Sequence, residues 1–476
     1  MIVLFAGTVV VSNFKNPSGS TNPNVKGISI VSITPYFNIK SLIPKFPTSA
    51  TTTSSALTTE CTQSKDLERA LKAKLGNSLK SFTLRKVTGD AFTKALKDGS
   101  VTYPLVNEKG KLVDVKLAAK PYSILSPDAT TGYIKGRDGK DQRVTLPQVT
   151  SYRLGLCSKD DLTCGTLTML DANKTQFEGY VLNKQVGFTF FEPVDNLLVL
   201  LGDKKTKAEP GCHVFYNSAQ HEAIPFFDDD PVVVNTKESF LPTVHADDVL
   251  TKTIPIELDS DATFYQLNTN TVWSRQLSIL SGVSLIYNFI EPLSNGNFNI
   301  NFLVKGQETW LPGYGPTTTN HTSLTNEIND ADYYMINHPD KNELSFFFVG
   351  YDVTDGYAGE AGGVCNVAGY DDTFGSDEDH QDNHAWGQQI LDSDGGYQFS
   401  TLYGRMIASG HEIAHMLGGT HGDGSANTCA AGLLNFVCGS SIMKSAAAGG
   451  VAPDFRKPFF TPKNSKNIVK CVKEAN

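Results

Sequence analysis

The chain has 476 residues and a formal net charge of −9, and 40% of its residues are hydrophobic and 19% charged. This composition is typical of a folded protein with more than one domain and excludes general disorder. The sequence has no long basic run, which argues against a nucleic-acid partner, and no apolar run long enough for a membrane span.

The first 60 residues are poor in charge. They begin with the apolar segment MIVLFAGTVVVSNF and include the Ser/Thr-rich run TSATTTSSALTTE at 48–60. The apolar segment could be a secretion signal, although it lacks a basic start and a clear cleavage site, or it could be a buried strand or a misassigned start. The Ser/Thr-rich run is typical of a linker or stalk. We therefore expect residues 1–60 to be a leader and low-complexity segment.

Residues 61–240 are expected to form a β-rich region. One helix is predicted near its start, in SKDLERALKAKL at 64–75, with Gly76 ending it. Strands are predicted at 179–194 and in the apolar run NLLVLLGD at 196–203. This region shows no constellation of residues that would carry catalysis.

From about residue 250 the pattern changes to alternating strands and helices. Strands are predicted at 253–259, 298–311 and 343–353, and a long helix at 262–290. This alternation favours an α/β fold for residues 250–476.

An acidic loop follows at 371–384, and it contains His380 and His384. It could bind a second cation, but its spacing matches no known ligand pattern, so calcium is unsupported and a solvated loop is the simpler interpretation.

The residues best suited to chemistry are concentrated in GHEIAHMLGGTHGDG at 410–424. A helix is predicted from Ser400 to Leu417, with Ser400 or Thr401 as its cap. His411 and His415 are four residues apart, so they lie on the same side of that helix and can share one metal ion.

Gly418 follows this helix directly. Glycine adopts the left-handed conformation without a steric penalty, so it can end the helix and let His421 return as a third nitrogen ligand. Three ligands leave a position for water, whose pKa zinc lowers to about 7, and Glu412 is placed to act as the general base. The whole pattern has chance odds of roughly one in fifty thousand in a chain of this length. It therefore predicts a zinc site that hydrolyses amide bonds.

The motif HEIAHMLGGTH resembles the metzincin zinc metallopeptidases, because it matches HExxHxxGxxH in full. The resemblance implies a metzincin-like catalytic domain, with a mixed twisted sheet, long helices, an active-site helix and a methionine turn. The segment CGSSIMKS supplies Met443 for that turn, and ordinary core packing is the alternative role for this methionine.

Within the metzincins, the adamalysin or reprolysin branch is the most similar. FNINFLVKGQETW resembles its early strand, and GYAGEAGGVCNVAGY resembles the Gly-rich segment that leads to the strand at the edge of its cleft. That edge strand binds the backbone of an extended peptide. The resemblance implies that residues 250–476 are the peptidase and that residues 61–240 are a pro-domain, as in a zymogen. One departure is Gly422, where this branch usually has Asp.

Eight cysteines are present and none forms a CxxC pair, so disulfides in a secreted protein are favoured over a thiolate zinc site. The resemblance favours a Cys365–Cys471 bond, which would tie the cleft-edge segment to a C-terminal helix. Cys429–Cys438 would clip the loop that follows the third histidine. Cys212 lies outside the usual switch motif of the branch, and we favour a disulfide partner for it over a thiol on the zinc.

These observations together predict a secreted, extracellular zinc endopeptidase, a monomer with one zinc ion per catalytic domain, which acts on proteins or peptides. The alternative is a catalytically idle metzincin homologue that works by binding a partner protein, and the intact Glu412 argues against it. An amidase for small peptides is a second alternative. The substrate and the processing site do not follow from the sequence.

Overall fold

The structure is a computed structural model, and it describes residues 58–221 and 250–474 with short gaps. The gaps are 77, 137–140, 156–162, 172–174, 184–185, 289–297, 321, 329–343, 355–356, 362–383, 393–396, 422–427, 430–437, 440 and 444–459. The leader, most of the Gly-rich segment and the acidic loop up to residue 383 therefore lie outside the described residues.

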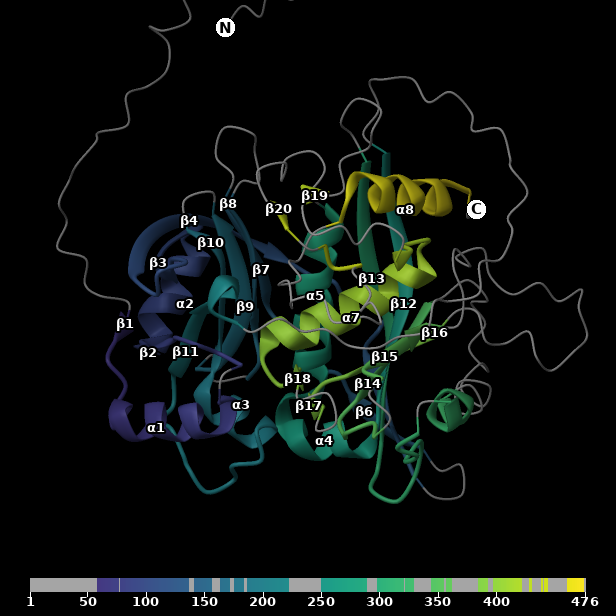
Figure 1. Ribbon diagram of the computed structural model, residues 1–476, viewed down its shortest axis with the longest axis horizontal. Coiled ribbons are helices and arrows are strands. Elements are labelled where there is room, and N and C mark those ends of the chain that lie inside the picture. The colour runs from purple at the N-terminus through teal and green to yellow at the C-terminus, as the bar shows by residue number, and fades with distance from the viewer. Residues whose placement is uncertain are drawn as a thin grey trace, which may run out of the picture. The chain divides into compact units, whose positions relative to one another are not determined.

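Most strands of the N-terminal region form a nine-stranded antiparallel sheet (Figure 1). In spatial order its strands are β1 (Thr58–Thr59), β2 (Thr83–Val87), β11 (Cys212–Asn217), β10 (Gly187–Pro193), β9 (Phe177–Asn183), β8 (Thr163–Met169), β7 (Ser151–Gly155), β4 (Leu112–Tyr122) and β3 (Ser100–Val106). Every residue of β8 is buried, so this central strand is covered on both faces. The expected β-rich character of this region is confirmed.

The described residues of the N-terminal region also form the helices α1, α2 and α3. Helix α1 (Ser64–Leu75) has the predicted bounds, and its buried leucines recur every four residues. Helix α2 (Gly89–Lys97) packs on β3 and β4. The strand predicted at 196–203 is wrong, because this segment holds helix α3 (Val194–Leu200). A short apolar run does not distinguish a buried helix from a buried strand.

The C-terminal region builds a seven-stranded mixed sheet. Its order is β15 (Gly359–Ala361), β16 (His384–Gln388), β14 (Leu344–Val349), β12 (Leu250–Ser260), β13 (Phe298–Trp310), β5 (Thr131–Lys135) and β6 (Gln142–Thr145). The five strands from β16 to β5 are parallel, and β15 and β6 are antiparallel to their neighbours. The strands predicted in residues 250–353 are confirmed.

Strands β5 and β6 come from the N-terminal region, so the division expected between 240 and 250 does not separate the two sheets. All described residues also fall within one unit, Ser55–Asn476. The assignment of the N-terminal region as a pro-domain stays a prediction.

The long helix predicted at 262–290 is interrupted. It consists of α4 (Ala262–Asn268), the 3₁₀ turn η4 (Thr269–Thr271) and α5 (Val272–Asn288). Thr269 has φ +25° at the end of α4, which an uninterrupted helix does not allow. The apolar periodicity continues across this break and therefore could not reveal it.

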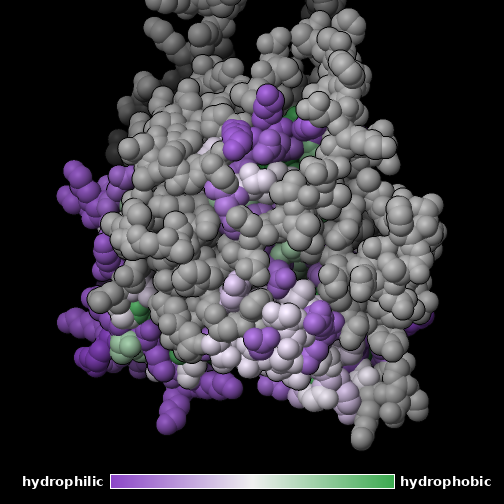
Figure 2. Space-filling model, turned by 45° about the vertical axis from the view of Figure 1, so that its right-hand side comes forward, coloured by the Kyte–Doolittle hydropathy of each residue, from purple (hydrophilic) through white to green (hydrophobic). Residues whose placement is uncertain are grey.

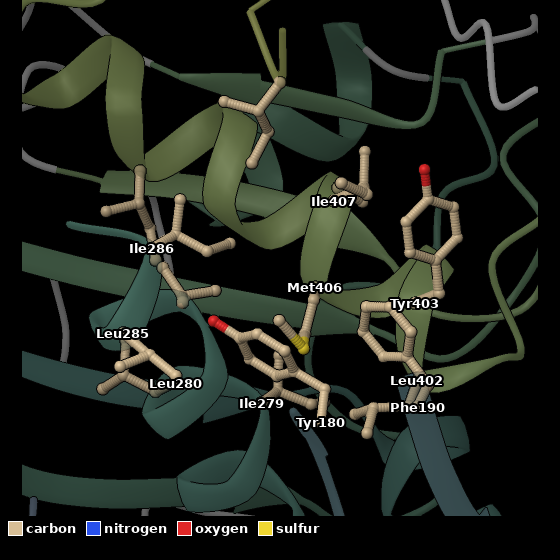
Figure 3. Packing of buried hydrophobic residues seen from close by; sticks show 14 of the residues in the cluster. Tyr180, Phe190, Ile279, Leu280, Leu285, Ile286, Leu402, Tyr403, Met406 and Ile407 are labelled. Carbon is tan, nitrogen blue, oxygen red and sulfur yellow. The ribbon is translucent and has the colours of Figure 1, made fainter. Parts of the chain in front are cut away.

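Helix α5 lies at the centre of the fold (Figure 1). It packs against β8 and β9 of the antiparallel sheet, and also against β13 and the helix α7 (Leu402–Met416). Buried side chains of β9, β10, α5 and α7 meet in one hydrophobic cluster (Figure 3), in which the rings of Phe190 and Tyr403 are 5.1 Å apart in an edge contact. The two regions therefore share a core.

The remaining elements are short, except for the C-terminal helix. They include η3 (Ser218–Gln220), a helix at 322–328, β17 (Leu391–Asp392), β18 (Tyr397–Gln398), β19 (Thr428–Cys429), β20 (Cys438–Gly439) and α8 (Pro462–Glu474). In the part of the chain that the structure describes, no helix has the length and apolar character needed to cross a membrane. The described residues on the face in Figure 2 are mainly hydrophilic.

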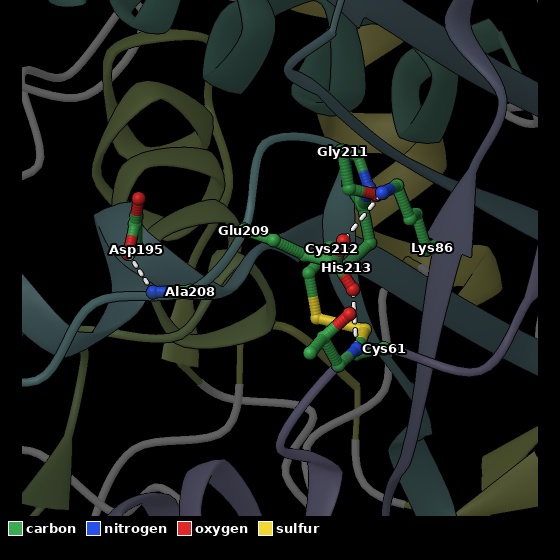
Figure 4. Close-up of a disulfide and its surroundings, with 9 residues drawn as sticks. Cys61, Lys86, Asp195, Ala208, Glu209, Gly211, Cys212 and His213 are labelled. Carbon is green, nitrogen blue, oxygen red and sulfur yellow. Dashed lines mark hydrogen bonds and ion pairs between the residues drawn. A yellow bond between two sulfur atoms is a disulfide. The ribbon is translucent and has the colours of Figure 1, made fainter.

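A disulfide joins Cys61 to Cys212, with their Cα atoms 5.6 Å apart (Figure 4). The expectation of a disulfide partner for Cys212 is confirmed, so this thiol cannot serve as a ligand switch. Cys471 is also disulfide-bonded, but Cys365 lies outside the described residues. Cys429 in β19 and Cys438 in β20 lie opposite each other in the register of the two strands, and their side chains are not described. The Cys365–Cys471 and Cys429–Cys438 disulfides therefore stay predictions.

Candidate metal centre

Helix α7 carries the HExxH part of the motif and is buried along its whole length. Thr401 caps it, because its side chain accepts a hydrogen bond of 3.1 Å from the backbone N–H of Gly404. The helix ends at Met416, and Gly418 follows with φ +95°, in the left-handed region. At this angle a residue other than glycine would be strained, so Gly418 allows the sharp turn that leads to His421.

The three histidines of the motif converge on one point. The Nε2 atom of His415 lies 3.0 Å from the Nε2 atoms of both His411 and His421, and the latter two atoms are 3.1 Å apart. Two nitrogen ligands on a tetrahedral zinc ion with bonds of 2.0–2.1 Å are separated by about 3.3 Å. The triangle of nitrogens therefore has nearly the size that one zinc ion requires.

Backbone carbonyls fix the tautomers of two of these rings. The Nδ1 atom of His411 lies 2.6 Å from the carbonyl oxygen of Ile442, and that of His415 lies 2.9 Å from the carbonyl oxygen of Gly419. A carbonyl oxygen only accepts, so Nδ1 carries the proton in both rings and Nε2 presents its lone pair. Lone pairs that face each other at 3.0 Å repel, and a cation between them would relieve this repulsion. The donor set therefore fits a metal ion.

Helix α8 holds the turn before the third histidine. The Oδ1 atom of Asn464 accepts a hydrogen bond of 2.9 Å from the backbone N–H of Thr420, and its Nδ2 group donates one of 3.1 Å to the carbonyl oxygen of the same residue. Asn464 is fully buried. This two-point contact fixes the backbone directly before His421.

Glu412 is fully buried next to His411, and the edge strand β15 passes against it. A Cβ atom placed on Gly359 would lie 2.6 Å from both Cγ and Cδ of Glu412, which is closer than real contacts allow. Glycine at position 359 therefore lets the backbone of β15 approach the carboxylate. β15 is also the outermost described strand on its side of the sheet.

Met443 is buried beneath the site. A Cβ atom placed on Gly419 would lie 3.1 Å from its Cε atom, so the methionine packs under the turn after α7. Its chain neighbour Ile442 supplies the carbonyl that accepts from His411. Packing is thus the visible contact of Met443, and its place in a methionine turn stays a prediction.

Sequence reasoning missed Ile442, Gly419, Gly359 and Asn464. The first two act through backbone carbonyls, which leave no mark on residue identity. Gly359 and Asn464 lie 53 residues before and 52 residues after Glu412 in the sequence. A glycine in the Gly-rich segment was the only available signal, and nothing distinguished it from its neighbours.

Two other places in the chain have residue types that bind metals. The first is the acidic loop at 371–384, of which only His384 lies within the described residues. His384 is the first residue of β16, and burial lowers its pKa to about 4. Glu257, Asp259 and Glu308 place carboxylate oxygens within 4.8 Å of one another, but the Nζ atom of Lys135 lies 3.1 Å from Glu308 Oε2. A lysine thus already supplies positive charge to this acidic group.

Neither a protein-family profile nor the sequence of a curated protein matches the chain. Among solved structures, the crystal structure of metalloproteinase-II from Bacteroides fragilis is similar over 79% of this chain and 92% of its own length. Its TM-score is 0.39 and its sequence identity 10%. A likeness this distant carries no argument about fold or function.

Proposed function

We propose that this protein is a zinc-dependent peptidase that hydrolyses peptide bonds with Glu412 as the general base. The observation that carries the proposal is the convergence of three Nε2 atoms, 3.0–3.1 Å apart, within a complete HExxHxxGxxH motif. Coordination by three imidazoles with no carboxylate or thiolate is typical of catalytic zinc sites that keep one open position.

His411, His415 and His421 would hold the zinc. A zinc ion in such a site is a Lewis acid that lowers the pKa of water and polarises a carbonyl group. Glu412 takes the proton from the attacking water and later delivers it to the leaving amine, because its carboxylate can act in turn as base and acid. Burial of Glu412 keeps bulk water from competing for that proton.

An extended peptide is the substrate shape that the edge strand favours. β15 is the outermost described strand next to Glu412, so a substrate backbone can add to it by main-chain hydrogen bonds. We propose an endopeptidase on this basis. The adamalysin-like identity rests on the sequence resemblance alone.

We also propose that the protein is secreted. Its disulfide between Cys61 and Cys212 supports this, because such bonds persist mainly in oxidising compartments. The competing proposal of an idle, partner-binding homologue has less support, since both the base and the three ligands are intact.

Replacement of Glu412 by Gln tests the proposal. Gln has nearly the shape of Glu and leaves the three ligands in place, but it cannot accept the proton. Cleavage of a dye-labelled unfolded protein should fall by about 10²–10⁴-fold while zinc content stays near one ion per chain. An equal cleavage rate with zinc bound in both proteins would show that Glu412 is not the base.

Two further assays separate the alternatives. A chelator should abolish cleavage by the parent protein, and added zinc should restore it. If the parent protein cleaves dipeptides and tripeptides but no unfolded protein, the small-peptide amidase is favoured. No chelator-sensitive cleavage of either kind would favour the binding protein.

A further inference from the structure

Side chains of the N-terminal sheet cap the start of α7, which we call the metal helix because it carries His411 and His415. The first N–H groups of a helix have no partner within the helix and need acceptors from elsewhere. Here the N–H of Leu402 donates to Glu192 Oε1 at 2.8 Å, and the N–H of Tyr403 donates to the hydroxyl of Tyr216 at 3.1 Å. Glu192 is in β10 and Tyr216 in β11, so two acceptors come from a distant part of the chain.

The third N–H group is also tied to this region. Gly404 donates to Thr401 Oγ1, and the same hydroxyl lies 2.9 Å from Nε2 of His221, just after η3. The hydroxyl of Tyr216 in turn donates to Glu192 Oε1 at 2.9 Å. The cap of α7 is therefore a connected network, and the N-terminal region provides three of its four side chains.

Buried ion pairs also connect α7 and α5 to the N-terminal sheet. Arg405 of α7 lies 2.9 Å from Glu192 Oε2 and 3.3 Å from Glu178 Oε2, and Arg275 of α5 lies 3.3 Å from that same Glu178 oxygen. All four side chains have zero exposure, and their formal charges cancel. If the N-terminal sheet were removed, both arginines would lose their acidic partners.

Apolar contacts continue the interface along α5 and α7 (Figure 3). The ring of Phe190 packs on Tyr403, and the hydroxyl of Tyr180 donates to the carbonyl oxygen of Gly282 at 3.1 Å. Because α5 packs against both sheets, departure of the N-terminal one would expose a large part of this apolar helix.

We infer that the N-terminal region is a lasting structural part of the active protein and that Glu192 and Tyr216 are positioning residues for the metal helix. A cut between the two regions, whether or not it occurs in maturation, leaves the fragments associated. Only the catalytic consequence of this inference rests on the proposed peptidase function, because association and zinc binding are measured without substrate.

The first test cuts the full-length chain. A recognition sequence for a site-specific protease is inserted between His221 and Leu250, and the cleaved protein is passed through native size-exclusion chromatography. The two fragments should co-elute with zinc bound. Separation of the two fragments under native conditions would overturn the inference.

The second test separates positioning from general packing. Glu192→Ala removes the acceptor for Leu402, whereas Glu192→Gln keeps an amide oxygen there. Zinc affinity, measured by competition with a chelator, should fall roughly tenfold in Glu192→Ala and be partly rescued in Glu192→Gln. Both variants should also melt at lower temperature, because each leaves Arg405 without one of its charged partners.

Tyr103→Phe is the matched control for Tyr216→Phe. Tyr103 is buried in the same sheet, and its hydroxyl makes no hydrogen bond within the part of the chain that the structure describes. Tyr216→Phe should weaken zinc binding and lower kcat with little change in KM, and Tyr103→Phe should do neither. Parent-like zinc affinity and kcat in both Glu192→Ala and Tyr216→Phe would refute the positioning role.

Discussion

The backbone of Gly359 lies directly against the side chain of Glu412, so closely that no Cβ atom fits between them. Gly359 belongs to the edge strand β15, and Glu412 follows His411 in helix α7. The strand that we propose to bind substrate therefore touches the proposed base. This contact links the position of a bound peptide to the position of the carboxylate.

Gly359→Ala should reduce peptide cleavage without loss of zinc. The added methyl group must displace either Glu412 or β15, and a shift of about 1 Å at a catalytic group can lower the rate about 100-fold. The control is Gly387→Ala, directly opposite in β16, whose added Cβ atom would come closest to Cζ of the Phe346 ring, at 3.1 Å, and would make ordinary contacts with Gln389 and Ala408. Rates for an unfolded protein substrate and zinc content check the prediction. Equal rates for the two variants would contradict it.

Asn464→Ala should weaken zinc binding. Its side chain holds both backbone groups of Thr420, next to the third histidine, and loss of such supporting contacts typically lowers metal affinity 10- to 100-fold. Asn467→Ala, one turn later on α8, is the control and should leave the affinity unchanged. Chelator competition measures both affinities, and a parent-like value for Asn464→Ala would show that the turn holds without it.

The sequence predicted the bounds of α7 well but not the residues that surround it. The spacing of His411 and His415 and the glycine at 418 depend on local geometry, which a few residues determine. Asn464 and Glu192 act across long sequence separations, and no spacing rule connects them to α7. The pairing of β5 with β13 is equally non-local, so the sequence suggested two separate regions where the structure has a shared sheet.

His415→Ala should abolish tight zinc binding and the stabilisation that zinc provides. Ligand binding to the folded state alone adds about 2.7 kcal/mol to stability at a free concentration 100 times the Kd. The melting temperature of the parent should therefore rise with added zinc, and that of His415→Ala should not. His384→Gln changes a buried histidine outside the triad and serves as control. A zinc-dependent rise in His415→Ala would place the metal elsewhere.

The stability of the metal-free protein should fall between about pH 6.5 and pH 4, with His213 as one cause. Burial lowers the pKa of His213 from 6.5 to about 4. The Nδ1–H group of this ring donates to the carbonyl oxygen of Gly211, and its Nε2 atom accepts from the N–H of Phe177. In this pH window the unfolded chain binds a proton that the folded chain does not bind. Folding is therefore disfavoured by up to about 1.4 kcal/mol per pH unit as the pH decreases.

Comparison of the parent with His213→Gln isolates this effect. Asp261 acts in the opposite direction, because burial raises its pKa to about 6, and its stabilising contribution is lost as the pH rises from about 4 to 6. Both proteins contain Asp261, so its contribution cancels in the difference. The variant should be less stable at pH 7, since its side chain loses the ring stacking on Phe177. The gap between the two melting temperatures should then narrow as the pH falls to 4, with a chelator present throughout. A gap that stays constant across this range would show that His213 does not titrate as its burial implies.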